Sequence, residues 1–293
     1  MEMKKGKFVY KDQQSMDKML KLYDKQMTLL GVDYSEKYIE TSFGKTHVVI
    51  AGDAAKPPIF TVHGGNGTTP LNLKLFLPLI KDYCLITPDV IGMPGKSDPY
   101  RTLDTAKDDF GKWLVEIMDA LKIDKIPFVV SSYSAAMLMS LAQVAPERIE
   151  KAALVVPSGI AHGPLFKIIR KMTVPMLGYY FVQSDSSFQK IMELMSSEED
   201  EQMKEFFQLM MSSYKMEMKP PREFSKKDLI GFDAPVIIFA SEEDIFFPSS
   251  RVFPRAKEMF SQKLVLREIN GNHLPSSDTM SSVCLSINEF FAS

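Results

Sequence analysis

Short, continuously apolar runs alternate with helical patterns along most of this 293-residue chain. Strands that are apolar on both faces are typical of a parallel sheet covered by helices on both sides. The expected strands span residues 46–50, 58–62, 83–87, 127–130, 151–156, 235–240 and 263–269. The alternation therefore predicts an α/β protein with a doubly wound, mostly parallel sheet. In such a fold, ligands bind at the carboxyl ends of the strands.

Apolar residues at helical spacing fill the segments between these strands. The first forty residues also look helical and amphipathic, with Met16, Met19, Leu20, Leu22 and Tyr23 in register. Residues 161–228 differ, because they contain no clear strand and hold nine of the twenty methionines. We interpret this stretch as a helical lid inserted between two strands. The core domain would then comprise residues 1–160 and 229–293.

The composition limits the classes of partner. A net charge of −2 gives no reason to expect nucleic acid or an anionic membrane. No stretch approaches the roughly 18 apolar residues that span a bilayer, and the N-terminus lacks the apolar segment of a secretory signal. Cys84 and Cys284 both lie in apolar patterns and are expected to be buried. We expect a cytoplasmic monomer or homodimer.

Serines cluster where the strand 127–130 passes into the next helix. The sequence there reads Val129-Val130-Ser131-Ser132-Tyr133-Ser134-Ala135-Ala136. A nucleophilic serine on a sharp strand-to-helix turn needs small residues two positions before and after it, because strand and helix nearly touch. Ser132 and Ala136 meet this need around Ser134, although glycines are usual there. We predict Ser134 as a nucleophile; the alternative is that these serines only cap the helix.

A glycine-rich loop follows the strand 58–62, in the sequence His63-Gly64-Gly65-Asn66-Gly67. Acyl transfer requires backbone N–H groups directed at the developing oxyanion, and glycine allows that close approach. We assign these donors to Gly65 and to Ala135, the residue after the predicted nucleophile. A dinucleotide-binding loop is disfavoured, because Pro70 replaces its third glycine. His63 is expected to brace the loop by hydrogen bonding.

An acid and a histidine follow two later strands. Asp244 comes after the apolar strand 235–240 and precedes apolar residues, whereas Glu242 and Glu243 read as a solvated turn. A triad acid is semi-buried, so that it can fix the tautomer of the histidine. His273 lies in the loop after the last strand. The order Ser134, Asp244, His273 is the one expected for a triad on this kind of sheet.

These motifs make the chain resemble the α/β-hydrolase superfamily over nearly its whole length. The segment Asp89-Val90-Ile91-Gly92-Met93-Pro94-Gly95-Lys96-Ser97 is similar to that family's D-x-x-G-x-G-x-S motif, with one additional residue between the glycines. The segment Ala145-Pro146-Glu147-Arg148-Ile149 resembles the P-x-x-V segment that follows the nucleophile helix. The resemblance is strongest to carboxylesterase-like members with a helical lid. It implies covalent, two-step hydrolysis that needs no cofactor and no metal.

The substrate is less constrained than the chemistry. The methionines of the lid would line an apolar pocket together with five phenylalanines, unless they only pack between helices; these are Phe166, Phe181, Phe188, Phe206 and Phe207. We favour a small carboxylic ester with apolar groups. A hydrolase of carbon–carbon bonds in ring-cleavage products, lactone or amide cleavage, and a non-catalytic ligand-binding protein remain alternatives.

Overall fold

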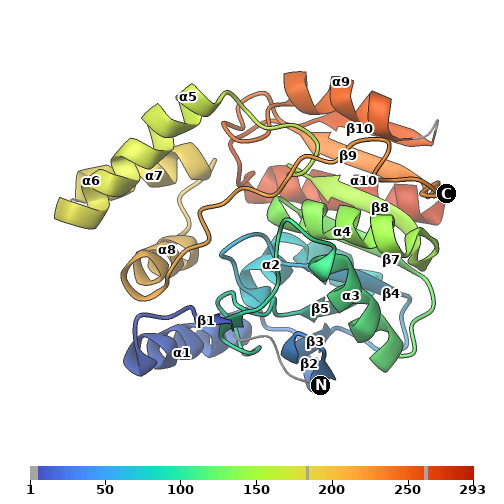
Figure 1. Cartoon of the computed structure of the whole chain (residues 1–293), viewed down its shortest axis with the longest axis horizontal. Coiled ribbons are helices and arrows are strands. Elements are labelled where there is room, and N and C mark those ends of the chain that lie inside the picture. The colour runs from blue at the N-terminus through green and yellow to red at the C-terminus, as the bar shows by residue number, and fades with distance from the viewer. Residues whose placement is uncertain (1–5, 183–184, 261–262) are drawn as a thin grey trace.

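The computed structural model describes residues 6–182, 185–260 and 263–293. Its centre is an eight-stranded sheet in the order β10-β9-β8-β7-β4-β5-β3-β2. Neighbouring strands from β10 to β5 are parallel, and β3 is antiparallel to both β5 and β2. The α/β-hydrolase fold expected from the sequence is therefore confirmed (Figure 1).

The strands and helices have the following bounds. The strands are β1 (Lys7–Phe8), β2 (Tyr34–Thr41), β3 (Gly44–Ala51), β4 (Pro58–Val62), β5 (Cys84–Pro88), β6 (Tyr100–Arg101), β7 (Ile126–Ser131), β8 (Ile149–Val155), β9 (Val236–Ala240) and β10 (Leu264–Glu268). The helices are α1 (Gln13–Leu29), α2 (Thr69–Leu75), α3 (Asp109–Ala120), α4 (Tyr133–Val144), α5 (Leu165–Ile168), α6 (Val174–Val182), α7 (Asp185–Met195), α8 (Glu201–Ser213), α9 (Ser249–Met259) and α10 (Ser277–Ala292). Strands β1 and β6 pair with each other outside the main sheet.

Side chains that alternate along the central strands build two cores, one on each face of the sheet. Val130 belongs to the core that packs against α3, α4 and α9. Its neighbour Val129 belongs to the core that packs against α1, α2 and α10. Because both faces are covered, these strands are apolar at consecutive positions, which is why they read as continuous runs in the sequence. Cys84 and Cys284 are buried and unpaired, as expected.

The N-terminal forty residues are only partly helical, so that part of the expectation is wrong. Helix α1 begins after Asp12, whose side chain accepts a hydrogen bond from the Ser15 amide at 2.7 Å. It ends before Gly31, which has a φ of 64°. Residues Tyr34–Thr41 then form β2, at the edge of the sheet. Most of its side chains are exposed, so it lacks the apolar run that revealed the central strands.

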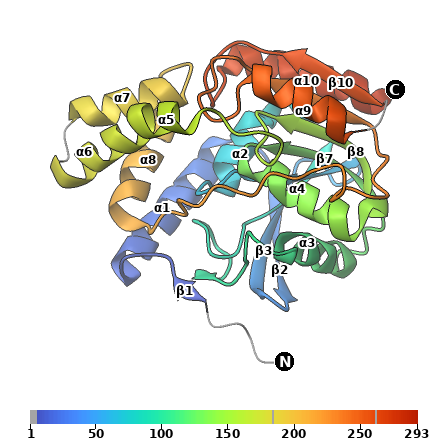
Figure 2. The ribbon, with the colours of Figure 1, turned by 45° about the horizontal axis from the view of Figure 1, so that its top comes forward.

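The segment predicted as a lid, residues 161–228 and called the lid below, lies between β8 and β9 in the chain (Figure 2). It carries α5 to α8, and a π-helical turn (Ile169–Thr173) joins α5 to α6. Pro175 has no N–H for the carbonyl of Lys171, and its ring would clash there, which explains the widened turn. Helix α8 packs against α1 through a third apolar cluster that includes Met19, Leu22 and Phe206. None of the described helices is long and apolar enough to cross a bilayer.

Candidate active site

Ser132 occupies the single-residue turn between β7 and α4. Its backbone has φ 55° and ψ −125°, a conformation that non-glycine residues rarely adopt. The surrounding chain holds this strain in place. The Ser132 amide donates to the Val155 carbonyl at 3.0 Å, and its own carbonyl accepts from the amides of Ala135 and Ser158, each at 3.1 Å. The sharp strand-to-helix turn predicted from the sequence is therefore present, but Ser132 occupies it instead of Ser134.

Ser132, His273 and Asp244 form a continuous hydrogen-bonded chain. Ser132 Oγ lies 2.8 Å from His273 Nε2, and His273 Nδ1 lies 2.9 Å from Asp244 Oδ2. A carboxylate only accepts hydrogen bonds, so Nδ1 carries the proton and Nε2 is free to accept the serine hydroxyl. Asp244 and His273 are buried. The rings of Phe246 and Phe247 pack against the imidazole, with distances of 5.0 and 5.5 Å between ring centroids.

The assignment of Ser134 as the nucleophile is contradicted. Its side chain is fully buried in the first turn of α4. Its Oγ donates to the Ser131 carbonyl at 2.7 Å and accepts from the Ser131 amide at 3.0 Å. Because these two bonds and its burial turn this hydroxyl away from His273, Ser134 serves to hold the start of the helix. The predicted partners Asp244 and His273 are brought together with Ser132 instead.

The glycine loop after β4 lies against the Ser132 turn. A Cβ on Gly65 would be 2.8 Å from Tyr133 Cδ2, so only glycine fits this approach. Tyr133 is the first residue of α4, where the helix offers its N–H no acceptor. The Ala135 amide, in contrast, donates to the Ser132 carbonyl. The Ala135 amide is therefore not available as the expected oxyanion donor, and the residue that follows Ser132 is Tyr133.

His63 braces the glycine loop, as expected from the sequence. Its Nδ1 donates to the Gly64 carbonyl at 2.9 Å, and its Nε2 accepts from the Val90 amide at 3.0 Å. This pattern needs the neutral imidazole. Burial favours the same form, because it lowers the pKa of His63 against the opposing charge of Asp89.

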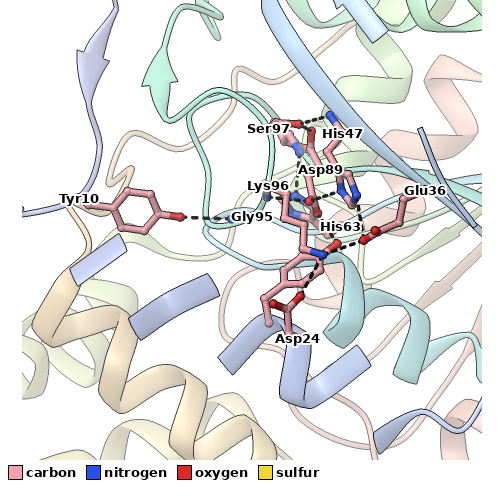
Figure 3. A network of polar contacts seen from close by, with 11 residues as sticks. Tyr10, Asp24, Glu36, His47, His63, Asp89, Gly95, Lys96 and Ser97 are labelled. Carbon is pink, nitrogen blue, oxygen red and sulfur yellow. Dashed lines mark hydrogen bonds and ion pairs between the residues drawn. The ribbon is translucent and has the colours of Figure 1, made fainter. Parts of the chain in front are cut away.

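Behind this loop, Asp89 organises a buried polar network (Figure 3). Its carboxylate accepts from His47 Nδ1 and the Lys96 amide, each at 2.9 Å, and His47 Nε2 reaches Glu36. Burial alone would raise the pKa of Asp89, but the hydrogen bond from His47 and the charge of His47 lower it. The D-x-x-G-x-G-x-S-like motif thus fixes the loop beside the site. A Cβ on Gly95 would lie 2.7 Å from the Asp89 carboxyl carbon.

The lid holds the glycine loop through Asn66. The Asn66 side chain accepts from the Glu217 amide at 2.7 Å and donates to the Glu217 carbonyl at 3.0 Å. This pairing of a carboxamide with a backbone unit stabilises the φ of 56° at Asn66, a conformation that asparagine tolerates. The return segment of the lid therefore fixes the loop that carries Gly65.

A second part of the lid holds the histidine loop. The Asn272 amide donates to Ser197 Oγ at 2.7 Å, and its side chain donates to the Glu193 carbonyl at 2.7 Å. The Leu274 amide donates to the Met195 carbonyl, also at 2.7 Å. His273 lies between these anchored neighbours. Neither lid contact is apparent from the sequence, because each joins polar residues from distant loops without a pattern of their own.

The aromatic residues of the lid do not gather in one pocket. Phe188 and Phe206 are buried between the lid and α1, and Phe207 packs partly buried against the same cluster. Phe166 is exposed. The side chain of Phe181 lies outside the described part of the chain. These positions agree with the packing interpretation of the lid. No group of three His, Cys, Asp or Glu side chains among the described residues could hold a metal ion.

Comparison with known proteins agrees with this fold. A family model for the alpha/beta hydrolase fold matches residues 57–194. The carboxylesterase YbfK of Bacillus subtilis is 27% identical over 139 residues, 46% of each chain. The uncharacterized carboxylesterase nap of the same organism is 29% identical over 136 residues, 46% of this chain and 45% of that protein. The chain spans about half the length of the curated relatives it matches.

A solved structure extends the likeness to nearly the whole chain. The naproxen esterase (carboxylesterase NP) from Bacillus subtilis matches with a TM-score of 0.77, covering 93% of this chain and 96% of that one. At 20% identity, this match shows a shared fold. Family model, relatives and solved structure together show that the chain is similar to alpha/beta hydrolases and has their fold. The curated relatives it matches are carboxylesterases.

Proposed function

We propose that this protein is a serine hydrolase that cleaves carboxylic esters through an acyl-enzyme intermediate, with Ser132 as the nucleophile. The observation that carries the proposal is the chain of hydrogen bonds from Ser132 through His273 to Asp244 on a strained turn. Unrelated structural serines have no reason to keep this geometry, which costs about 1–3 kcal/mol of backbone strain. The carboxylesterases among the relatives support the same reaction class.

The geometry defines a sequence of proton transfers. His273 Nε2 takes the hydroxyl proton as Ser132 Oγ bonds to the ester carbonyl carbon. Asp244 stabilises the resulting imidazolium. The amides of Gly65 and Tyr133 donate to the oxyanion, and loss of one such donor costs about 10²–10³ in kcat. His273 then protonates the departing alcohol. A water molecule activated by His273 hydrolyses the acyl-enzyme and releases the acid.

An ester with apolar groups suits the surroundings of the triad. Phe246 and Phe247 pack beside His273, and they would favour an apolar group next to the scissile bond. The lid remains the proposed source of further substrate contacts. Every group in the mechanism belongs to the chain, so the proposal requires no cofactor. A cytoplasmic location is part of the proposal, supported by the two unpaired cysteines.

Active-site labelling tests the assignment. A fluorophosphonate probe should modify Ser132, as located by peptide mass spectrometry, and p-nitrophenyl esters should be hydrolysed. Ser132→Ala should remove labelling and lower kcat by about 10⁶. Ser134→Ala is the matched control, two residues away, and should keep the labelling. Labelling of Ser132→Ala but not of Ser134→Ala would refute the assignment.

Two further outcomes would change the proposed reaction. Turnover of a vinylogous diketone without turnover of simple esters would indicate carbon–carbon bond hydrolysis on the same triad. Absence of both labelling and turnover in the folded protein would indicate a ligand-binding protein.

A further inference from the structure

The outer surface of the lid concentrates exposed apolar side chains. Five large hydrophobic residues on α5, the π-helical turn and α6 are between 44% and 76% exposed; they are Leu165, Phe166, Ile169, Val174 and Leu177. They are five of the twelve large exposed hydrophobic residues in the described part of the chain, yet they lie within thirteen consecutive positions. Figures 1 and 2 place α6 at the outer edge of the molecule, with α5 between α6 and the sheet domain. We call these five residues the outer lid surface.

Positive charge accompanies this surface. Lys167, Arg170 and Lys171 lie on the same segment and are exposed, and residues 164–182 include no acidic side chain. Among the described residues, Arg170 and Lys171 form no ion pair, and Lys167 lies close enough to Glu242 to lower the pKa of that carboxyl, after the stronger effect of Ser250. The segment is thus locally basic in a chain whose net charge is −2.

We propose that the outer lid surface docks on an anionic lipid–water interface. Apolar side chains that enter the acyl boundary, flanked by lysine and arginine that meet anionic headgroups, are the features of interfacial helices. This proposal departs from the expectation of no membrane partner, which rested on the net charge of the whole chain. It concerns the outside of the lid and does not depend on the catalytic assignment.

A second copy of the chain fits this surface less well. In a two-fold dimer, the same surface faces itself, so the three cations of one copy would oppose the three of the other. A lipid interface offers the opposite charge instead. The cytoplasmic leaflet carries such anionic lipids, so docking there is compatible with a cytoplasmic location.

Vesicle binding tests the proposal on the full-length protein. Vesicles of equal phosphatidylglycerol and phosphatidylcholine should retain the protein in a flotation assay, and vesicles of pure phosphatidylcholine should retain much less. Replacing Lys167, Arg170 and Lys171 by Gln should lower the partition coefficient on anionic vesicles about a hundredfold. Replacing Leu165, Phe166 and Ile169 by Ser should lower the partition coefficient on both kinds of vesicle. Ile230→Ser, 79% exposed outside the lid, is the matched control and should bind as the wild type does.

A fluorescent reporter distinguishes insertion from non-specific adsorption. Trp113 is the only tryptophan and is fully buried. In Phe166→Trp, emission from the new indole should shift to shorter wavelength on anionic vesicles, while the wild-type emission stays constant. Absence of both flotation and spectral shift would overturn the proposal. So would concentration-dependent dimerisation abolished by the triple Ser variant, because the surface would then be an interface between copies.

Discussion

Replacing Ser132 by Gly and by Ala separates backbone strain from chemistry. Both variants lose the hydrogen bond to His273 equally, so their difference in stability reports the backbone alone. Alanine keeps a Cβ at φ 55° and ψ −125°, and with it about 1–3 kcal/mol of strain. Glycine releases that strain, but the larger conformational entropy of glycine in the unfolded chain lowers the stability of the variant by about 0.5–1 kcal/mol. We expect Ser132→Gly to be about 1 kcal/mol more stable than Ser132→Ala.

Urea unfolding measured by the fluorescence of the buried Trp113 gives this difference directly. The control pair is Ser134→Gly and Ser134→Ala, inside α4 at an unstrained helical position. There the order should reverse, with glycine about 1 kcal/mol less stable. If Ser132→Gly is instead less stable than Ser132→Ala, the turn is not strained, and backbone strain no longer supports Ser132 as the nucleophile.

Three other perturbations test neighbouring parts of the site. Asp244→Asn should lower kcat by about 10⁴, because the tautomer of His273 is no longer fixed; a loss below tenfold in ester turnover would exclude this acid. In Asn66→Gly, the glycine can adopt the φ of 56°, but both hydrogen bonds to Glu217 are lost. The free energy of unfolding should therefore fall by about 1–2 kcal/mol. The decrease in kcat should be larger than the change in KM. An unchanged kcat would separate the lid contact from catalysis. Burial lowers the pKa of His63 in the folded protein. The neutral ring therefore contributes to stability above the pKa of about 6.5 that histidine has in the unfolded chain, and this contribution is lost as the pH falls through the pKa of the folded state. The stability advantage of wild type over His63→Gln should therefore shrink below pH 6.5, and a constant difference down to pH 4.5 would contradict this.

The sheet could be predicted because burial on both faces leaves a continuous apolar signal, as at Val129 and Val130. Strand β2 could not, since its exposed edge has no such signal. The pairing of Asp244 with His273 could be predicted because each follows an apolar strand. The sequence points to Ser134 rather than to Ser132, the serine that contacts His273, because small neighbours surround Ser134 while Ser132 has Val130 before it.

The prediction of Ala135 as an oxyanion donor depends on that of Ser134, because Ala135 follows Ser134. The same rule applied to Ser132 selects Tyr133, the donor proposed above. Where several serines lie together, side-chain size cannot decide which residue makes the turn. The decisive quantity is the backbone conformation, together with the hydrogen bonds that hold it, and these depend on Val155 and Ser158 from the next strand.

Two hydrogen-bonded contacts between the lid and the core limit how this protein can be re-engineered. Asn66 and Glu217 join one end of the lid to the glycine loop, and Asn272 joins another part to the histidine loop. Replacing the whole lid by that of a relative, to broaden the substrate range, would remove both contacts at once. Grafts that exchange only residues 164–192 would leave Glu193 to Ser197 and Glu217 in place. Such grafts would change the helices α5 and α6 while the glycine loop and the histidine loop keep their contacts with the lid.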